Sequence, residues 1–160
     1  MKGIIIIVLA ILCNNSWAQT NYDNVKLETA ADCKAADPIA LEASTYLLST
    51  PFEKDNVIRL NSLSFIIKWM SATPDYTFSI DEMASKIMKG NDELLGLYMA
   101  AMTKYCLENK ASSKDQKLIK LNAVIYVLKY CEDEKNNMKM TKQLKKLSDA
   151  KAKGELESSL

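Results

Sequence analysis

Helix start signals recur along this chain and constrain its fold more than any other feature. Asp37 is followed by Pro38, which combines an N-cap residue with the residue favoured at the first helical position. Ser79 and Glu82 have the spacing of a capping box, in which each side chain binds a backbone N–H group left free by the first turn. The same spacing recurs at residues 113–116. Signals of this kind predict several separate helices of ordinary length.

These signals divide the chain into six helices, and no segment favours a strand. The β-branched pair Val124-Ile125, for example, lies inside a capped run that is too long for a strand. The second, fourth and fifth helices are apolar on most sides, so we expect them in the core. The predicted helices span residues 37–49, 56–71, 80–89, 91–109, 114–132 and 137–152. Gly90 suits the left-handed position after the third helix, and Asn137 is expected to cap the last one.

The start of each helix and the start of the next helix but one are on average about 40 residues apart. That spacing is expected for successive helical hairpins and overlaps the repeat lengths of α-solenoid proteins. No repeated side-chain signature accompanies this spacing. We therefore predict an all-α fold in which six helices form three antiparallel hairpins, arranged as a short α-solenoid-like stack or as an irregular helical bundle. A single helical domain is expected at residues 37–153, after a polar N-terminal arm at 19–36 and before a frayed C-terminal tail at 154–160.

Residues 1–18 have the organisation of a secretory signal peptide. Lys2 precedes an apolar run at residues 4–12, and the small residues Ser16 and Ala18 stand three and one positions before a cleavage at Gln19. The apolar run is shorter than the roughly 20 residues that span a bilayer. We therefore expect export to the periplasm, with secretion or outer-membrane association as alternatives.

Cysteine positions refine this expectation. Cys13 leaves with the signal peptide, and its lipidation is the alternative, although Leu12 is larger than the residue usually found before a lipidated cysteine. Cys106 and Cys131 lie toward opposite ends of an expected antiparallel helix pair, roughly 20 Å apart, whereas a disulfide needs Cα atoms within about 7 Å. We expect these two thiols to be unpaired, and the pairing of Cys33 stays open.

Composition excludes several classes of function. The chain has no histidine, a net charge of +1 and a single arginine, Arg59. Histidine is the most common general base at neutral pH and a common metal ligand. The planar guanidinium group of arginine is a common ligand of phosphate. A nearly neutral chain also lacks the field that attracts nucleic acid. We therefore expect no catalytic residue, no cofactor, no metal and no nucleic-acid partner.

Charge is distributed unevenly along the chain. Residues 19–58 carry seven acidic side chains and three lysines, and residues 135–160 carry seven lysines and three acidic side chains. The two groups can meet within one fold or between neighbouring copies. Either contact would contribute only about 0–1 kcal/mol for each exposed pair.

The last predicted helix has a basic amphipathic pattern. Its apolar side is narrow and lacks aromatic residues, which favours an outer covering helix over contact with anionic lipid. Attraction of an acidic partner stays a hypothesis for its polar side. The lysines of that side are Lys139, Lys142, Lys145 and Lys146.

Two further segments carry candidate binding residues. Asp75, Tyr76 and Phe78 lie on a loop stiffened by proline, where exposed aromatic side chains often bind partners; alternatively, the two rings fold back and close the core. Residues 99–106 place two methionines and a cysteine on one helix face, a pattern that suits Cu(I) but is more typical of core packing. We interpret that face as core.

Residues 69–78 (Trp-Met-Ser-Ala-Thr-Pro-Asp-Tyr-Thr-Phe) and 90–99 (Gly-Asn-Asp-Glu-Leu-Leu-Gly-Leu-Tyr-Met) resemble segments of uncharacterised small exported all-helical proteins of Gram-negative bacteria. The resemblance covers most of the chain after the signal peptide. It implies export and a helical fold, and it brings no activity or ligand. The paired helices are also similar in layout to tetratricopeptide-type solenoids, although their W-x-x-L-G-x-x-Y pattern is not matched.

The sequence thus predicts an exported, non-catalytic helical interaction module that binds a protein or peptide. The alternative is a carrier of a small apolar ligand between the central helices. An enclosed pocket of several hundred Å³ would favour the carrier, and a packed interior with an exposed docking face would favour the interaction module.

The exported protein is expected to begin at Gln19, because Ser16 and Ala18 satisfy the small-residue rule while the bulky Trp17 occupies the position that tolerates size. Mass spectrometry of protein recovered from the cell envelope and medium measures this directly. A diacylglyceryl group on Cys13, or an uncleaved chain in the cytoplasm, would contradict the prediction.

Overall fold

The computed structural model describes residues 21–160, which contain seven α-helices, four short 3₁₀ helices and no strand. This confirms the all-α prediction. The predicted signal peptide lies outside the described residues. The α-helices are α1 (Ala30–Ala35), α2 (Asp37–Ser49), α3 (Val57–Ala72), α4 (Glu82–Met88), α5 (Glu93–Glu108), α6 (Gln116–Glu132) and α7 (Lys142–Ala152), and the 3₁₀ helices are η1 (Tyr22–Asn24), η2 (Lys110–Ser112), η3 (Glu134–Asn136) and η4 (Glu157–Ser159).

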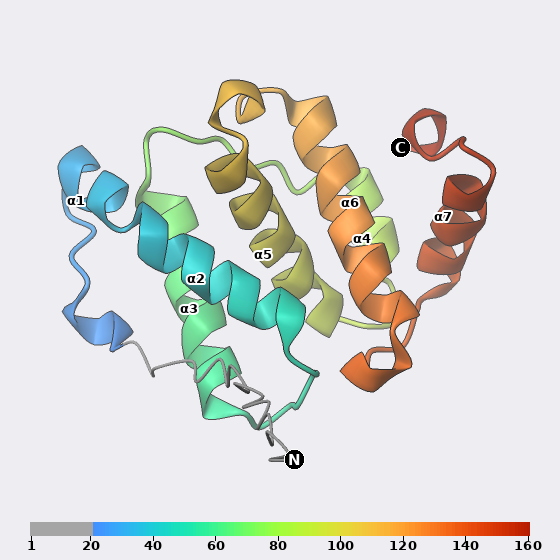
Figure 1. Ribbon diagram of the computed structural model, residues 1–160, viewed down its shortest axis with the longest axis horizontal. Helices are drawn as coiled ribbons and strands as arrows, with labels where there is room; N and C mark the ends of the chain where they lie inside the picture. Colours follow the sequence, from blue (N-terminus) through green and yellow to red (C-terminus); the bar gives the residue numbers. More distant parts are fainter. Residues whose placement is uncertain (1–20) are drawn as a thin grey trace, which may run out of the picture.

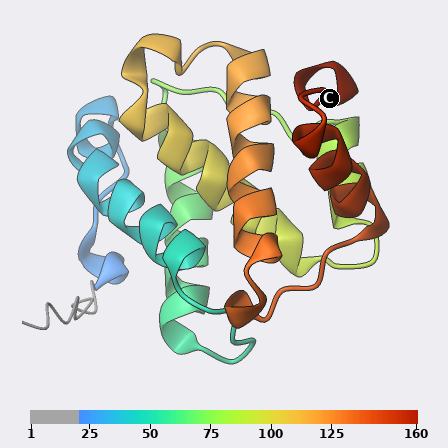
Figure 2. The ribbon, with the colours of Figure 1, turned by 45° about the vertical axis from the view of Figure 1, so that its right-hand side comes forward.

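The helix α5 lies at the centre of the fold. It packs against α2 and α6 on one face of the molecule and against α3 and α4 on the other (Figure 1). At one end α1 covers α2 and α3, and at the other α7 covers α4 and α6 (Figure 2). The largest interfaces join α5 to α2 and α6, which were predicted to lie in three different hairpins, so the three-hairpin layout is not confirmed.

Small residues let the central helices approach each other closely. Ala40 and Ala43 of α2 and Ala100 of α5 are fully buried in one core cluster. Ala101 of α5 and Ala123 of α6 are fully buried in a second. The two adjacent alanines of α5 therefore face different neighbours, and α5 contributes to both parts of the core. None of the helices of residues 21–160 is both long and apolar enough to cross a membrane.

Two helix starts differ from the prediction because a carboxylate lies closer to the first turn than the predicted serine. Asp81, not Ser79, caps α4 and accepts a hydrogen bond from the backbone N–H of Ala84 at 3.1 Å. Asp115, not Ser113, caps α6 and accepts from two backbone N–H groups. A carboxylate also interacts favourably with the positive end of the helix dipole, which a hydroxyl does not.

Two further predicted caps are displaced. Asp37 lies in the first turn of α2, because α1 runs directly into α2 through Ala36. Thr141 caps α7, and the predicted cap Asn137 instead adopts a left-handed conformation with φ 54° after η3. Gly90 has φ 89°, which confirms the left-handed position predicted for it.

Both ends of the described chain pack on the helices. In the predicted polar arm, the Tyr22 ring stacks on Phe65 at a centroid distance of 4.8 Å, and its hydroxyl lies 3.0 Å from Ser62 Oγ. In the predicted tail, Leu156 is buried and the backbone oxygen of Leu160 accepts a hydrogen bond from a lysine of α6. These contacts hold both terminal segments against the helices, although the composition of the segments alone predicts no packing.

The single arginine connects three elements. Arg59 is buried on α3, and its guanidinium donates to the backbone oxygens of Thr50 at 3.0 Å and Leu47 at 3.2 Å, at the carbonyl end of α2. It also lies over the rings of Phe52 and Tyr130. The carbonyl dipoles of α2 and the π faces thus replace a carboxylate as the partners of this buried cation.

Replacing Arg59 by Met should lower the free energy of unfolding by about 2–4 kcal/mol, because the carbonyls at the end of α2 lose charged donors and stay buried. Arg59→Lys should lower the free energy of unfolding by less than Arg59→Met does. Some loss is expected because an ammonium group lacks the planar geometry of the guanidinium group. Urea denaturation measures both. The control is Lys117→Met on the exposed side of α6, expected within about 0.5 kcal/mol of the parent; an equal loss in the control would contradict the assignment.

Candidate functional site

The loop between α3 and α4 folds back onto the core. The rings of Tyr76 and Phe78 are half-buried and lie 5.5 and 5.9 Å from the Trp69 ring. Trp69 is fully buried, and its Nε1 donates to the backbone oxygen of Cys33 at 3.1 Å. The two aromatic side chains therefore close one end of the core, which was the alternative interpretation of this loop. Of the three candidate residues on it, only Asp75 is exposed.

A buried carboxylate, which the sequence did not single out, lies beside this loop. Asp37 is only 8% exposed, and its Oδ2 accepts from the Tyr76 hydroxyl at 3.4 Å and pairs with Lys110 Nζ at 3.5 Å. Within residues 21–160 its Oδ1 has no hydrogen-bond partner. Only the fold could reveal the group, because Asp37 and Tyr76 are 39 residues apart in sequence.

This cluster is poorly suited to acid–base chemistry near neutral pH. Burial raises the pKa of Tyr76 to about 12, and the charge of Asp37 and the hydrogen bond to it act in the same direction. The phenol thus stays protonated and donates to the carboxylate. We interpret the cluster as a link between the start of α2 and the loop.

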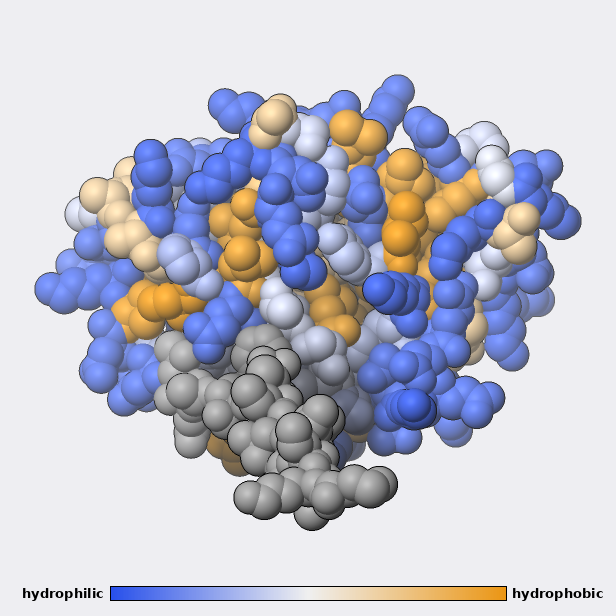
Figure 3. Space-filling model, viewed as in Figure 1, coloured by the Kyte–Doolittle hydropathy of each residue, from blue (hydrophilic) through white to orange (hydrophobic). Residues whose placement is uncertain are grey.

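The helix α7 covers α4 and α6 as predicted. Leu144 and Leu147 are fully buried, so the apolar side of α7 is occupied by the protein's own core. Figure 3 shows a mostly hydrophilic surface over α7. Within the described part of the chain, no ion pair involves the four exposed lysines Lys139, Lys142, Lys145 and Lys146.

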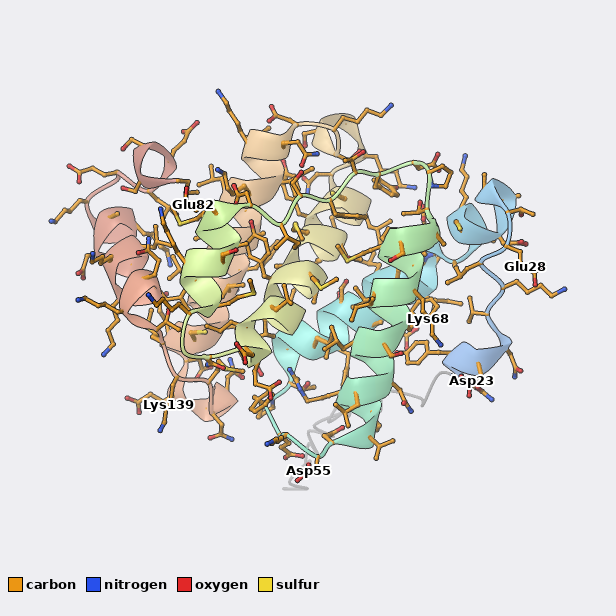
Figure 4. All side chains as sticks on the ribbon, turned by 180° about the vertical axis from the view of Figure 1, so that it is seen from behind. Asp23, Glu28, Asp55, Lys68, Glu82 and Lys139 are labelled. Atoms are coloured by element: carbon orange, nitrogen blue, oxygen red, sulfur yellow. The ribbon has the colours of Figure 1, made fainter. Side chains whose placement is uncertain are left out.

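Part of the acidic region lies far from the basic region. Figure 4 shows Asp23 and Glu28 at the end formed by η1 and α1, and Lys139 on the side where α7 lies. Contact within one fold is therefore excluded for these three charges. Elsewhere the two regions touch, because the backbone N–H of Phe52 donates to the backbone oxygen of Asn136 at 2.9 Å. Contact between separate molecules stays open.

The sulfur-containing face of α5 belongs to the core. Met102 and Cys106 are buried, and Met99 is half-buried at the edge of the same cluster. Burial raises the pKa of the Cys106 thiol to about 12. Cys33, Cys106 and Cys131 are all free, which confirms that Cys106 and Cys131 do not pair.

An exposed apolar stripe on α3 was missed because we predicted this helix to be central. Val57, Leu60 and Ile67 are 61%, 53% and 42% exposed. With the exposed Ser64 between them, they follow the alternating three- and four-residue spacing of a helix-docking seam. We call residues 57, 60, 64 and 67 the α3 seam. That spacing is visible in the sequence, but it does not tell which apolar side of the helix faces the core.

A shallow apolar groove borders the α3 seam, lined by residues that include Phe52, Leu60 and Leu63. A Cβ atom on Gly96 of α5 would lie 2.8 Å from a methyl carbon of Leu63, so the glycine allows α3 and α5 to pack closely. The groove holds about 40 Å³. That volume is far below the roughly 300 Å³ of a small-molecule pocket.

Three larger depressions lie at the surface. Their volumes are about 340, 290 and 340 Å³, and all three are open to solvent. The largest interface of the core, between α5 and α6, is filled by side chains such as Val124, Val127 and Leu128, all fully buried. The carrier hypothesis gains no support from these features and stays a prediction.

Asp37→Asn should lower the pKa of Tyr76 from about 12, because the negative charge beside the phenol is removed; the value should stay above 10 because burial is the larger cause. Ultraviolet titration, with Tyr76→Phe used to identify the signal, measures this. The control is Asp75→Asn. The charge of Asp75 raises the pKa of Tyr76 less than that of Asp37 does, so its removal should lower this pKa by less. Since the folded pKa exceeds the unfolded value, the contribution of Tyr76 to stability should be lost between pH 10 and 12. An unchanged titration in Asp37→Asn would contradict the contact.

Comparisons of the chain with protein-family models, with curated proteins and with solved structures found no match.

Proposed function

We propose that this protein is an exported, non-catalytic helical interaction module that binds a helix of a protein partner along the α3 seam. The observation that carries the proposal is the exposure of Val57, Leu60 and Ile67 on one face of a 16-residue helix. Within residues 21–160 only one other large apolar side chain, Ile80, is comparably exposed.

The seam favours a protein partner on energetic grounds. Fully burying a large aliphatic side chain contributes about 1.5–3 kcal/mol, so three half-exposed ones leave roughly 2–4 kcal/mol of unused burial. A clustered apolar surface of this kind marks interaction sites more often than isolated exposed residues do. Ser64, in the middle of the seam, is small enough for another helix to approach closely.

The basic face of α7 has a supporting role in this proposal. Because the apolar side of α7 is already buried, the helix lacks the free apolar face that inserts into lipid. Exposed lysines instead raise the rate of encounter with an acidic partner and are screened by salt. They attract such a partner without holding the complex together.

A photo-crosslinking amino acid in place of Leu60 or Ile67, introduced in cells, tests the docking surface. Discrete crosslinked products are expected at both positions. The matched control is the same substitution at Ile80, which is 46% exposed but lies on the loop before α4. Products of equal yield at Ile80, or none at Leu60 and Ile67, would contradict the proposed surface.

A further inference from the structure

The α3 seam is complementary to itself when two copies are antiparallel. A two-fold axis level with residue 62 places Val57 opposite Ile67 of the second copy and Leu60 opposite Ser64 of the second copy. Each large Leu60 side chain then meets a small serine, which leaves space for it between the helices. The same contacts occur twice, because in a two-fold interface each residue pair is repeated.

Charge at the edges of the seam favours the same orientation. Asp55 precedes α3 by two residues and Lys68 lies in its C-terminal half (Figure 4). Both are exposed, and within residues 21–160 no ion pair involves either side chain. In the antiparallel pair Asp55 lies within one residue of the level of Lys68 of the second copy. A parallel pair would instead place each of these charges beside its own equivalent.

We propose that the partner of the α3 seam is a second copy of this chain, bound as an antiparallel, two-fold symmetric α3–α3 pair. This inference rests on the proposed function of the seam as a docking surface for a helix. It adds the identity of the helix and the orientation in which it binds.

The length of the seam sets the expected affinity. Val57 and Ile67 are about 15 Å apart along the helix axis. A contact of that length buries less than the roughly 800 Å² per partner of a standard stable interface. We therefore expect a weak, reversible dimer with a dissociation constant in the range of roughly micromolar to millimolar.

Sedimentation velocity on the full chain and on the chain beginning at Gln19 tests the proposal. Both should sediment as a monomer of 18.0 kDa or slightly less at low concentration and approach twice that mass as the concentration rises above the dissociation constant. Leu60→Glu should weaken the dimer at least tenfold without changing the circular dichroism spectrum. Ile80→Glu, an equally exposed position off the seam, should leave it unchanged.

Charge reversal tests the orientation separately. Asp55→Lys should weaken the dimer by about threefold to tenfold, because two symmetric attractions become repulsions. The double variant Asp55→Lys/Lys68→Asp should restore the parent affinity to within about twofold. A dimer that Leu60→Glu abolishes but the double variant does not restore would overturn the antiparallel orientation.

Other outcomes separate this inference from the proposed function. A monomer at every concentration, with Leu60 crosslinked in cells to a protein of different mass, would overturn self-association and leave the docking surface in place. Dimerisation of the shorter chain alone would overturn the proposal for the full chain. A monomer without crosslinks at Leu60 and Ile67 would overturn both.

Discussion

The fold depends on the burial of one cation at the carbonyl end of α2. Arg59 binds the backbone oxygens of Leu47 and Thr50, and no carboxylate within the described residues pairs with it. This contact fixes which side of α3 faces the protein. Successive residues of a helix are rotated by about 100°, so Val57 lies on the side turned away from Arg59 and Leu60 lies beside it. The interaction that holds α3 in place thus also exposes the N-terminal half of its seam.

The central helix α5 lies between the two ends of the molecule. It joins two parts of the core, one formed with α2 and α3 and the other with α4, α6 and α7. Because α5 lies between them, the helices α3 and α7 are on opposite sides of the fold (Figure 1).

Local signals predicted most helix ends to within a few residues, because caps and glycines act within one turn. Gly90 and the start of α2 show this, and the displaced caps at Asp81 and Asp115 are shifts of only two residues. The arrangement of helices was not predictable in the same way. Both α3 and α5 are apolar on most sides, and only the tertiary contacts decide that α5 is central and α3 partly exposed. Contacts between distant residues, such as Asp37 with Tyr76, leave no local pattern in the sequence.

An interaction module with these two surfaces would combine their effects. In the proposed dimer the seams are buried at the two-fold axis, and both α7 helices remain at the outer ends, because α7 and α3 lie on opposite sides of each copy. Two lysine faces held in one particle bind a second acidic site at a raised effective concentration. Each attraction between an exposed lysine and an acidic group is weak and screened by salt, and alone it does not hold a complex together. In the dimer these attractions would add up. In this proposal, the apolar seam would determine which chains associate, and the charged helices would determine how strongly the assembled pair attracts its surroundings.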